Sequence, residues 1–115
     1  MELFVTQHII HCQEPWYSFI KSGVKTVEGR KAVGNYRSIK KDDIITFYNN
    51  DEKFDCNVSG VNCYSSLEEY LTTETLARTL PGIKTIDEGI KIYLQWSTKE
   101  QIAKNGFLGI QVKVI

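Results

Sequence analysis

Segments rich in β-forming residues stand at both ends of the chain and in its middle, and this order restricts the fold more than any other feature. The strand-like segments span residues 3–10, 44–48, 54–61 and 107–115. Residues 49–52 (Asn-Asn-Asp-Glu) supply polar turn residues between the two central segments, which predicts a hairpin and an antiparallel sheet. Helical signals are grouped between the central strands and the last one. We therefore predict an α+β fold, a small β-barrel of mainly antiparallel strands with short helices covering its open end.

Capping residues mark where the later helices begin and end. Ser66 and Thr85 each stand three residues before a glutamate, which is the arrangement of a capping box. A third helix is predicted from Thr98 to about residue 104, where Asn105 and Gly106 end it. Short helices should therefore follow each of these hydroxyl residues.

The composition is that of a single folded domain. The chain has 115 residues, of which 42% are hydrophobic and 24% charged, so it has room for one core and we expect one domain over residues 1–115. No apolar run approaches the length of a membrane span, and the N-terminus lacks the pattern of a signal peptide. From this we expect an intracellular protein, cytoplasmic or nuclear, without a membrane partner. A monomer is the default expectation.

The histidines and cysteines indicate neither a metal site nor a disulfide framework. On a strand, His8 and His11 point to opposite faces. Cys12, Cys56 and Cys63 form no CxxC pair, and their odd number favours buried, reduced thiols. We expect no metal and no cofactor.

Charge is distributed unevenly along the chain, although the net charge is zero. Residues 21–41 carry seven basic residues against Glu28 alone, a net charge of +6, so the remainder carries −6. The basic residues of this stretch are Lys21, Lys25, Arg30, Lys31, Arg37, Lys40 and Lys41. A local basic field of this kind attracts a phosphate backbone, while the alternative is an ordinary solvated face.

Within this stretch, a short helix is followed directly by a strand. This arrangement places two cations, Lys25 and Arg30, close to the carboxylate of Glu28. Pro15 suits the first helical position, Gly23 suits a left-handed helix end, and the strand begins near Lys25. With a period of two, Glu28 and Arg30 share a strand face. The cluster is either a ligand-binding cleft or a structural ion-pair network. If it is exposed and functional, replacing Glu28 by glutamine should hardly change the melting temperature.

Trp16 and Gly29 also have two interpretations each. Trp16 either stacks on a base, as aromatic platforms in nucleic-acid-binding proteins do, or belongs to the core, and we favour the core. Gly29 marks either a β-bulge or a place where a ligand or another backbone comes close.

These residues resemble the ASCH domain (activating signal cointegrator homology), whose signature is Gly-x-Lys-x-x-Glu-x-Arg. The four signature positions match at Gly23, Lys25, Glu28 and Arg30. The likeness continues through residues 41–47, 80–82, 87–93 and the closing strand, and thus covers most of the chain. The resemblance implies a barrel of the PUA-like superfamily and a role in binding RNA during transcription coactivation, RNA processing or translation.

The preferred hypothesis is a binding module for single-stranded RNA or a modified nucleotide. Lys25 and Arg30 would contact phosphate or a base edge, and Glu28 would accept from an amino group or hold Arg30 in place. The basic residues that follow the RNA backbone, together with the candidate stacking residue, would be Lys21, Lys31, Arg37 and Trp16.

The alternative hypothesis is a small amidohydrolase, with Lys25 and Glu28 as the catalytic residues. Some bacterial proteins similar to this domain remove the acetyl group from N4-acetylcytidine with a lysine, a threonine and a glutamate. Their lysine matches Lys25, but their threonine falls at Glu28, and Thr26 lies two residues away. Their glutamate comes from a later loop, near Glu68, Glu69 or Glu74. Some family members are also proposed to cleave RNA, but neither histidine falls in the signature.

Overall fold

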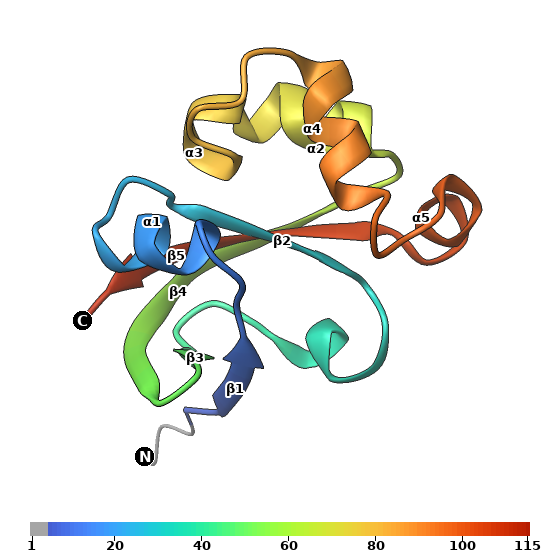
Figure 1. Ribbon diagram of the computed structural model, residues 1–115. Coiled ribbons are helices and arrows are strands. Elements are labelled where there is room, and N and C mark those ends of the chain that lie inside the picture. Colours follow the sequence, from blue (N-terminus) through green and yellow to red (C-terminus); the bar gives the residue numbers. More distant parts are fainter. Residues whose placement is uncertain (1–4) are drawn as a thin grey trace.

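The computed structural model describes residues 5–115, which form one five-stranded sheet and a set of short helices (Figure 1). The strands are β1 (Gln7–His11), β2 (Val27–Lys31), β3 (Ile44–Asn49), β4 (Glu52–Tyr64) and β5 (Phe107–Val114). Their order in the sheet is β1-β3-β4-β5-β2. All neighbours are antiparallel except β1 and β3, which are parallel. The predicted α+β fold with a mainly antiparallel sheet is confirmed.

The sheet curls into a half-barrel rather than a barrel closed by a backbone ladder. Strand β4 has 13 residues and pairs with β3 along its first half and with β5 along its second, with a register shift between Val58 and Gly60. A bulge of this kind bends a strand and increases its twist. Figure 1 shows β3 and β1 curled beneath β2 and β5. The C-terminal strand β5 therefore lies inside the sheet, and β1 and β2 are its two edges.

The helices begin where their capping residues predict. They are α1 (Trp16–Lys21), α2 (Leu67–Glu74), α3 (Leu76–Thr79), α4 (Ile86–Tyr93) and α5 (Lys99–Asn105), with a 3₁₀ helix, η1 (Gly34–Ser38). The hydroxyls of Ser66, Thr85 and Thr98 each accept a backbone N–H three residues on, and Gly106 ends α5 at φ +89°. The sequence signals predict neither helix α3 nor η1. Within residues 5–115, no helix is both long and apolar enough to cross a membrane.

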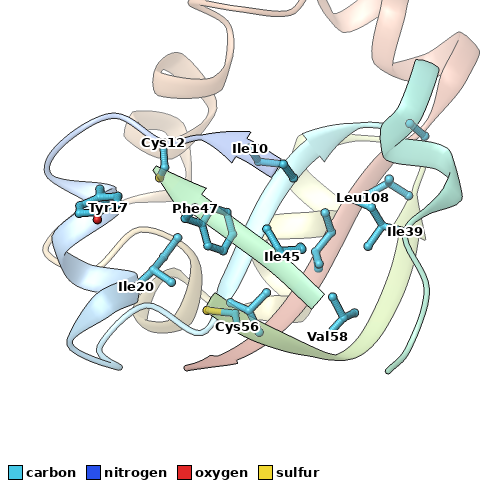
Figure 2. Close-up of a cluster of buried hydrophobic side chains, with 13 residues drawn as sticks. Ile10, Cys12, Tyr17, Ile20, Ile39, Ile45, Phe47, Cys56, Val58 and Leu108 are labelled. Atoms are coloured by element: carbon cyan, nitrogen blue, oxygen red, sulfur yellow. The ribbon is translucent and has the colours of Figure 1, made fainter. Parts of the chain in front are cut away.

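Two hydrophobic cores lie on opposite sides of β2 and β5. The first fills the curled sheet, where Ile45 and Phe47 of β3 meet Tyr17 and Ile20 of α1 (Figure 2). The second lies between the sheet and helices α2 to α4, which Figure 1 shows stacked above β2 and β5. Helix α1 thus packs against the interior of the half-barrel, as expected for the helix before Gly23, whereas the later helices cover the outer face of the sheet.

Two facing glycines make room for an aromatic side chain in the second core. Gly29 of β2 pairs directly with Gly109 of β5. A Cβ atom on Gly29 would lie 2.6 Å from the hydroxyl oxygen of Tyr70 and 2.7 Å from the Phe107 ring. Tyr70 is completely buried and packs edge-on against the Phe107 ring at a centroid distance of 4.9 Å. Gly29 thus lies in a regular ladder without a bulge, and the groups that come close to it are a buried cluster of aromatic side chains rather than another backbone.

Replacing Gly29 by alanine should lower the free energy of unfolding by about 1–3 kcal/mol, because the added methyl group overpacks this cluster. Urea unfolding followed by circular dichroism measures the change. Gly60→Ala is the matched control, because its Cβ would meet only the flexible end of Gln111. Equal stability of the Gly29 variant and the native protein would show that the contact with Tyr70 relaxes without cost.

The edge strand β1 is attached to the turn before β3 by a buried carboxylate. Asp43 accepts hydrogen bonds from His8 Nε2 at 2.8 Å, from the Lys40 backbone N–H at 3.1 Å and from Lys40 Nζ at 2.9 Å. Burial alone would raise the pKa of Asp43, but the hydrogen bonds from Lys40 and His8 outweigh it and lower the pKa to about 2.

Asp43 should therefore make stability depend on acid pH. Because its pKa is lower in the folded chain than in the unfolded one, it stabilises the fold above about pH 4 and loses this effect as the pH falls towards 2. Chemical unfolding at several pH values between 2 and 5 should show a shallower pH dependence for Asp43→Asn than for the native protein. Parallel curves for the two proteins would contradict this assignment.

Candidate functional site

The centre of the site is the carboxylate of Glu28, which lies between two cations on β2 and just before it. Glu28 Oε2 is 2.8 Å from Nη2 of Arg30 and 3.2 Å from its Nε, and Oε1 is 3.4 Å from Nζ of Lys25. The backbone N–H of Gly29 also donates to Oε1 at 3.2 Å. Burial tends to raise the pKa of Glu28, but Arg30 and Lys25 together lower it, so the carboxylate is ionised.

The cluster is buried, so the condition under which replacing Glu28 would hardly change the melting temperature is not met. Glu28 is 6% exposed and Lys25 1% exposed, while the Arg30 side chain keeps 23% of its surface accessible. Ionised groups removed from water are stable only when they are paired and hydrogen-bonded. The three residues satisfy that condition by pairing with one another.

Lys25 is held in the interior by backbone carbonyls as well as by Glu28. Its Nζ donates to the carbonyl of Val27 at 2.7 Å and to the carbonyl of Thr79 at the end of α3. The ammonium also lies 5.8 Å from the centre of the Trp16 ring. Burial lowers the pKa of Lys25, and the Glu28 carboxylate opposes this effect. Two hydrogen bonds to backbone carbonyls and one ion pair thus anchor the Lys25 ammonium inside the protein.

Arg30 bridges the two edges of the sheet. Its Nη2 donates to the backbone carbonyl of His11 in β1 at 2.8 Å, and its Nη1 donates to the hydroxyl of Tyr36 at 3.2 Å. Burial tends to lower the pKa of Arg30, but the Glu28 carboxylate raises it, so the guanidinium stays charged. Of its five N–H groups, one on Nη1 has no partner among the residues that the structure describes.

A cleft of about 430 Å³ opens over this cluster, and its size is that of a small-molecule site. Lys25, Glu28 and Arg30 line it, together with Lys31 and Cys12. Its aromatic lining residues come from four separate segments and are Trp16, Tyr36, Tyr93, Trp96 and Phe107. The cleft thus combines one charged cluster with extensive aromatic walls.

The structure brings together some of the predicted site residues and separates others. Lys25, Glu28, Arg30, Lys31 and Trp16 all line the cleft. Lys21 and Arg37 do not line it and lie exposed on α1 and η1. Trp16 is half-buried and packs against both cores, so the core interpretation and a place in the cleft wall both hold.

The additional residues of the amidohydrolase hypothesis lie elsewhere. Thr26 does not line the cleft, and neither do Glu68, Glu69 and Glu74. Glu74 is buried on the helical side of the sheet, where it accepts hydrogen bonds from the hydroxyl of Tyr64 and the amide of Asn62. The Cys12 thiol lies 4.0 Å from Glu28 Oε2, but burial raises its pKa to about 12, so it stays protonated and is a poor nucleophile.

The sequence patterns do not predict Trp96, Tyr36 and Cys12 as cleft residues, and they place Tyr93 only in the core. Trp96 lies in the segment between α4 and α5, just before the capping residue Thr98. A large aromatic residue between two helices, off the apolar stripe of either, is the signal that could have indicated it. Tyr36 lies in η1, which the sequence signals do not predict, and it reaches the cleft beside Arg30.

Comparison with known proteins places this geometry in a family. The model of the ASCH domain matches residues 10–114. The chain belongs to the ASCH domain family. Of the residues on which the resemblance was noted, Gly23 turns the chain after α1 at φ +84°, and Lys25, Glu28 and Arg30 form the charged cluster.

Solved structures with the same fold include two of similar length. The hypothetical protein PH0355 is 35% identical, with a TM-score of 0.89, covering 96% of this chain and 100% of that one. Protein PF0455 from Pyrococcus furiosus is 31% identical, with a TM-score of 0.79, covering 96% and 98%. The S128A mutant of ZmASCH from Zymomonas mobilis shares the fold at 12% identity and a TM-score of 0.65, covering 94% and 68%. No curated protein matches the chain.

Proposed function

We propose that this ASCH domain binds single-stranded RNA or a modified nucleotide, with one nucleotide entering the cleft over Glu28. The observation that carries the proposal is the combination of aromatic walls with a guanidinium that keeps an N–H free. Aromatic surfaces stack on bases, and arginine N–H groups donate to base edges or phosphates. The RNA-binding role that the family resemblance implies points in the same direction.

The burial of the cluster supports a different role for each of its members from the one first expected. Lys25, on the buried side of the cluster, neutralises and positions Glu28. Glu28 in turn holds the guanidinium of Arg30 in one orientation. Arg30 is then the residue of the cluster that contacts the ligand. A guanidinium fixed before binding loses less conformational entropy when the ligand arrives.

The basic residues outside the cluster would contact the RNA backbone. Lys31 lies half-buried in the cleft wall, and Arg37 is exposed on η1, which Arg30 joins through Tyr36. A nucleotide in the cleft would bring its neighbours within reach of such side chains. Phosphate contacts of this kind supply affinity and position without sequence preference.

The amidohydrolase hypothesis gains no specific support from the cleft. A deacetylase similar to the bacterial proteins needs a hydroxyl nucleophile and a second carboxylate beside the lysine, and neither Thr26 nor the later glutamates line the cleft. Incubation with N4-acetylcytidine, with chromatographic detection of cytidine, tests the activity separately. Product formation that depends on Lys25 would reopen this function.

Binding of short single-stranded RNA should weaken steeply with salt, and the Lys31→Ala, Arg37→Ala double variant should depend less on salt. Removing one phosphate-binding side chain should reduce the slope of log affinity against log salt by about 0.7. Fluorescence anisotropy at several salt concentrations measures both slopes.

The Lys91→Ala, Lys113→Ala double variant is the control, because it removes the same number of positive charges from exposed positions outside the cleft. It should keep the native slope and most of the affinity. Absence of RNA binding at low salt, or equal losses of affinity in the two double variants, would contradict the proposed backbone contacts.

A further inference from the structure

Trp96 is a large aromatic side chain that the fold leaves uncovered at the cleft. It lines the cleft but is 48% exposed, unlike the buried Tyr93 and Phe107 of the same wall. Its backbone is fixed, because its N–H donates to the carbonyl of Tyr93 at the end of α4. Trp96 therefore presents accessible aromatic surface at a defined place. About half of its surface is not covered by other residues of this domain.

The ring of Trp16, by contrast, already has partners inside the protein. The Lys25 ammonium lies 5.8 Å from the centre of its ring, and the Phe19 ring packs against it at 6.1 Å. Trp16 thus holds the charged cluster in place. Trp96 is the more exposed of the two tryptophans that line the cleft, and its ring is the better candidate for stacking on a ligand.

The charged cluster has hydrogen-bond donors that are available to a ligand, whereas its acceptor oxygens are already occupied. Both oxygens of Glu28 already accept hydrogen bonds from within the protein. Arg30 keeps one N–H on Nη1, and the hydroxyl of Tyr36, which accepts from that same nitrogen, retains its own proton as a donor. These two donors are adjacent, because one hydrogen bond joins their parent atoms at 3.2 Å.

We propose that the cleft selects a nucleobase that carries a carbonyl oxygen, with Trp96 stacking on the face of the base and the adjacent donors of Arg30 and Tyr36 directed at that oxygen. This inference rests on the proposed function and names the class of base that it takes. Hypoxanthine, guanine and uracil present such an oxygen. Adenine presents an amino group at the corresponding edge. This hydrogen-bond donor would face the two donors of Arg30 and Tyr36 and could not pair with them.

Inosine 5′-monophosphate and adenosine 5′-monophosphate are the matched probes for this discrimination. They share the purine skeleton, the sugar and the phosphate. They differ at position 6, where inosine has a carbonyl and adenosine an amino group, and at N1, which is protonated in inosine and an acceptor in adenosine. Isothermal titration calorimetry with the native protein should give at least about tenfold tighter binding of the inosine nucleotide. Tyr36→Phe, which removes one donor, should reduce this preference and leave the affinity for the adenosine nucleotide nearly unchanged.

The stacking role of Trp96 is tested by substitution in the same assay. Trp96→Ala should weaken binding of both nucleotides by about tenfold, and Trp96→Phe should restore part of the loss. Ile9→Ala is the control, because Ile9 is an exposed apolar residue outside the lining of the cleft. Thermal unfolding of each variant verifies that it is folded.

The outcomes separate the inference from the proposed function. Equal affinity for the two nucleotides, or unchanged binding in Trp96→Ala, would overturn the inference even if RNA binding were salt-sensitive as proposed. Failure of both nucleotides and of RNA to bind would overturn the inference together with the function. Preferential binding of the inosine nucleotide that depends on Trp96 and Tyr36 would establish the base site.

Discussion

Replacing Glu28 by glutamine should lower the free energy of unfolding by about 3–5 kcal/mol, the range expected when one partner of a buried ion pair is removed. The variant keeps the shape of the side chain but leaves two cations, Lys25 and Arg30, without their shared carboxylate. Both are held in place by further hydrogen bonds, and Lys25, which is 1% exposed, cannot reach water without disturbing the wall of the cleft. Urea unfolding at neutral pH gives the change directly.

Glu68→Gln is the matched control for this experiment. Glu68 lies exposed in the first turn of α2, away from any ion pair found in residues 5–115. Its replacement should change the free energy of unfolding by less than about 0.5 kcal/mol. If the Glu28 variant behaved like this control, the carboxylate would not be the structural centre of the site.

Replacing Lys25 by methionine should lower the free energy of unfolding by about 2–4 kcal/mol. Methionine fills nearly the same volume but donates no hydrogen bond, so the carbonyls of Val27 and Thr79 lose their buried donor, at about 1–3 kcal/mol for each unpaired group. This donor joins α3 to the segment before β2, together with the backbone hydrogen bond from the Thr26 N–H to the Arg78 carbonyl. Thermal and chemical unfolding of the variant measure the loss.

The result also separates a structural lysine from a catalytic one. A lysine retained for catalysis is expected to cost stability where it is buried, so its replacement would abolish activity and leave the fold equally or more stable. A structural lysine shows the opposite behaviour. Lys21→Met is the control, because Lys21 is exposed on the neighbouring helix α1. A Lys25→Met protein as stable as the Lys21→Met protein would contradict the assignment of Lys25 to the support of Glu28.

Much of the fold is encoded in local sequence signals. The hairpin of β3 and β4 follows from alternating strands around a polar turn, and helices α2, α4 and α5 begin after Ser66, Thr85 and Thr98 because those hydroxyls satisfy free backbone donors. The parallel pairing of β1 with β3 could not be predicted in this way. It joins residues more than thirty positions apart, and no local sequence pattern in either strand indicates which strand it pairs with.

The residues of the candidate site could be predicted from the sequence, but their burial could not. A period of two assigns Glu28 and Arg30 to one strand face, yet it does not say whether that face is covered. The burial of the cluster depends on neighbouring elements, because Trp16 of α1 and Thr79 of α3 contact Lys25, and Tyr36 of η1 contacts Arg30. Trp96 joins the cleft from the far end of α4, which no spacing within the signature reveals. The basic residues of positions 21–41 do not all lie at the cleft either, because Lys31 lines it and Lys21 does not.

The cleft over Glu28 is the proposed ligand site, and mapping of backbone amide resonances tests this placement most directly. A chain of 115 residues is well suited to such spectra. Addition of short single-stranded RNA, and separately of inosine 5′-monophosphate, should shift the amide signals of Gly29, Arg30, Tyr36 and Trp96, with little change on the outer surfaces of α2 and α5. Shifts confined to those outer surfaces, or no shifts at saturating ligand, would contradict the placement of the ligand in this cleft.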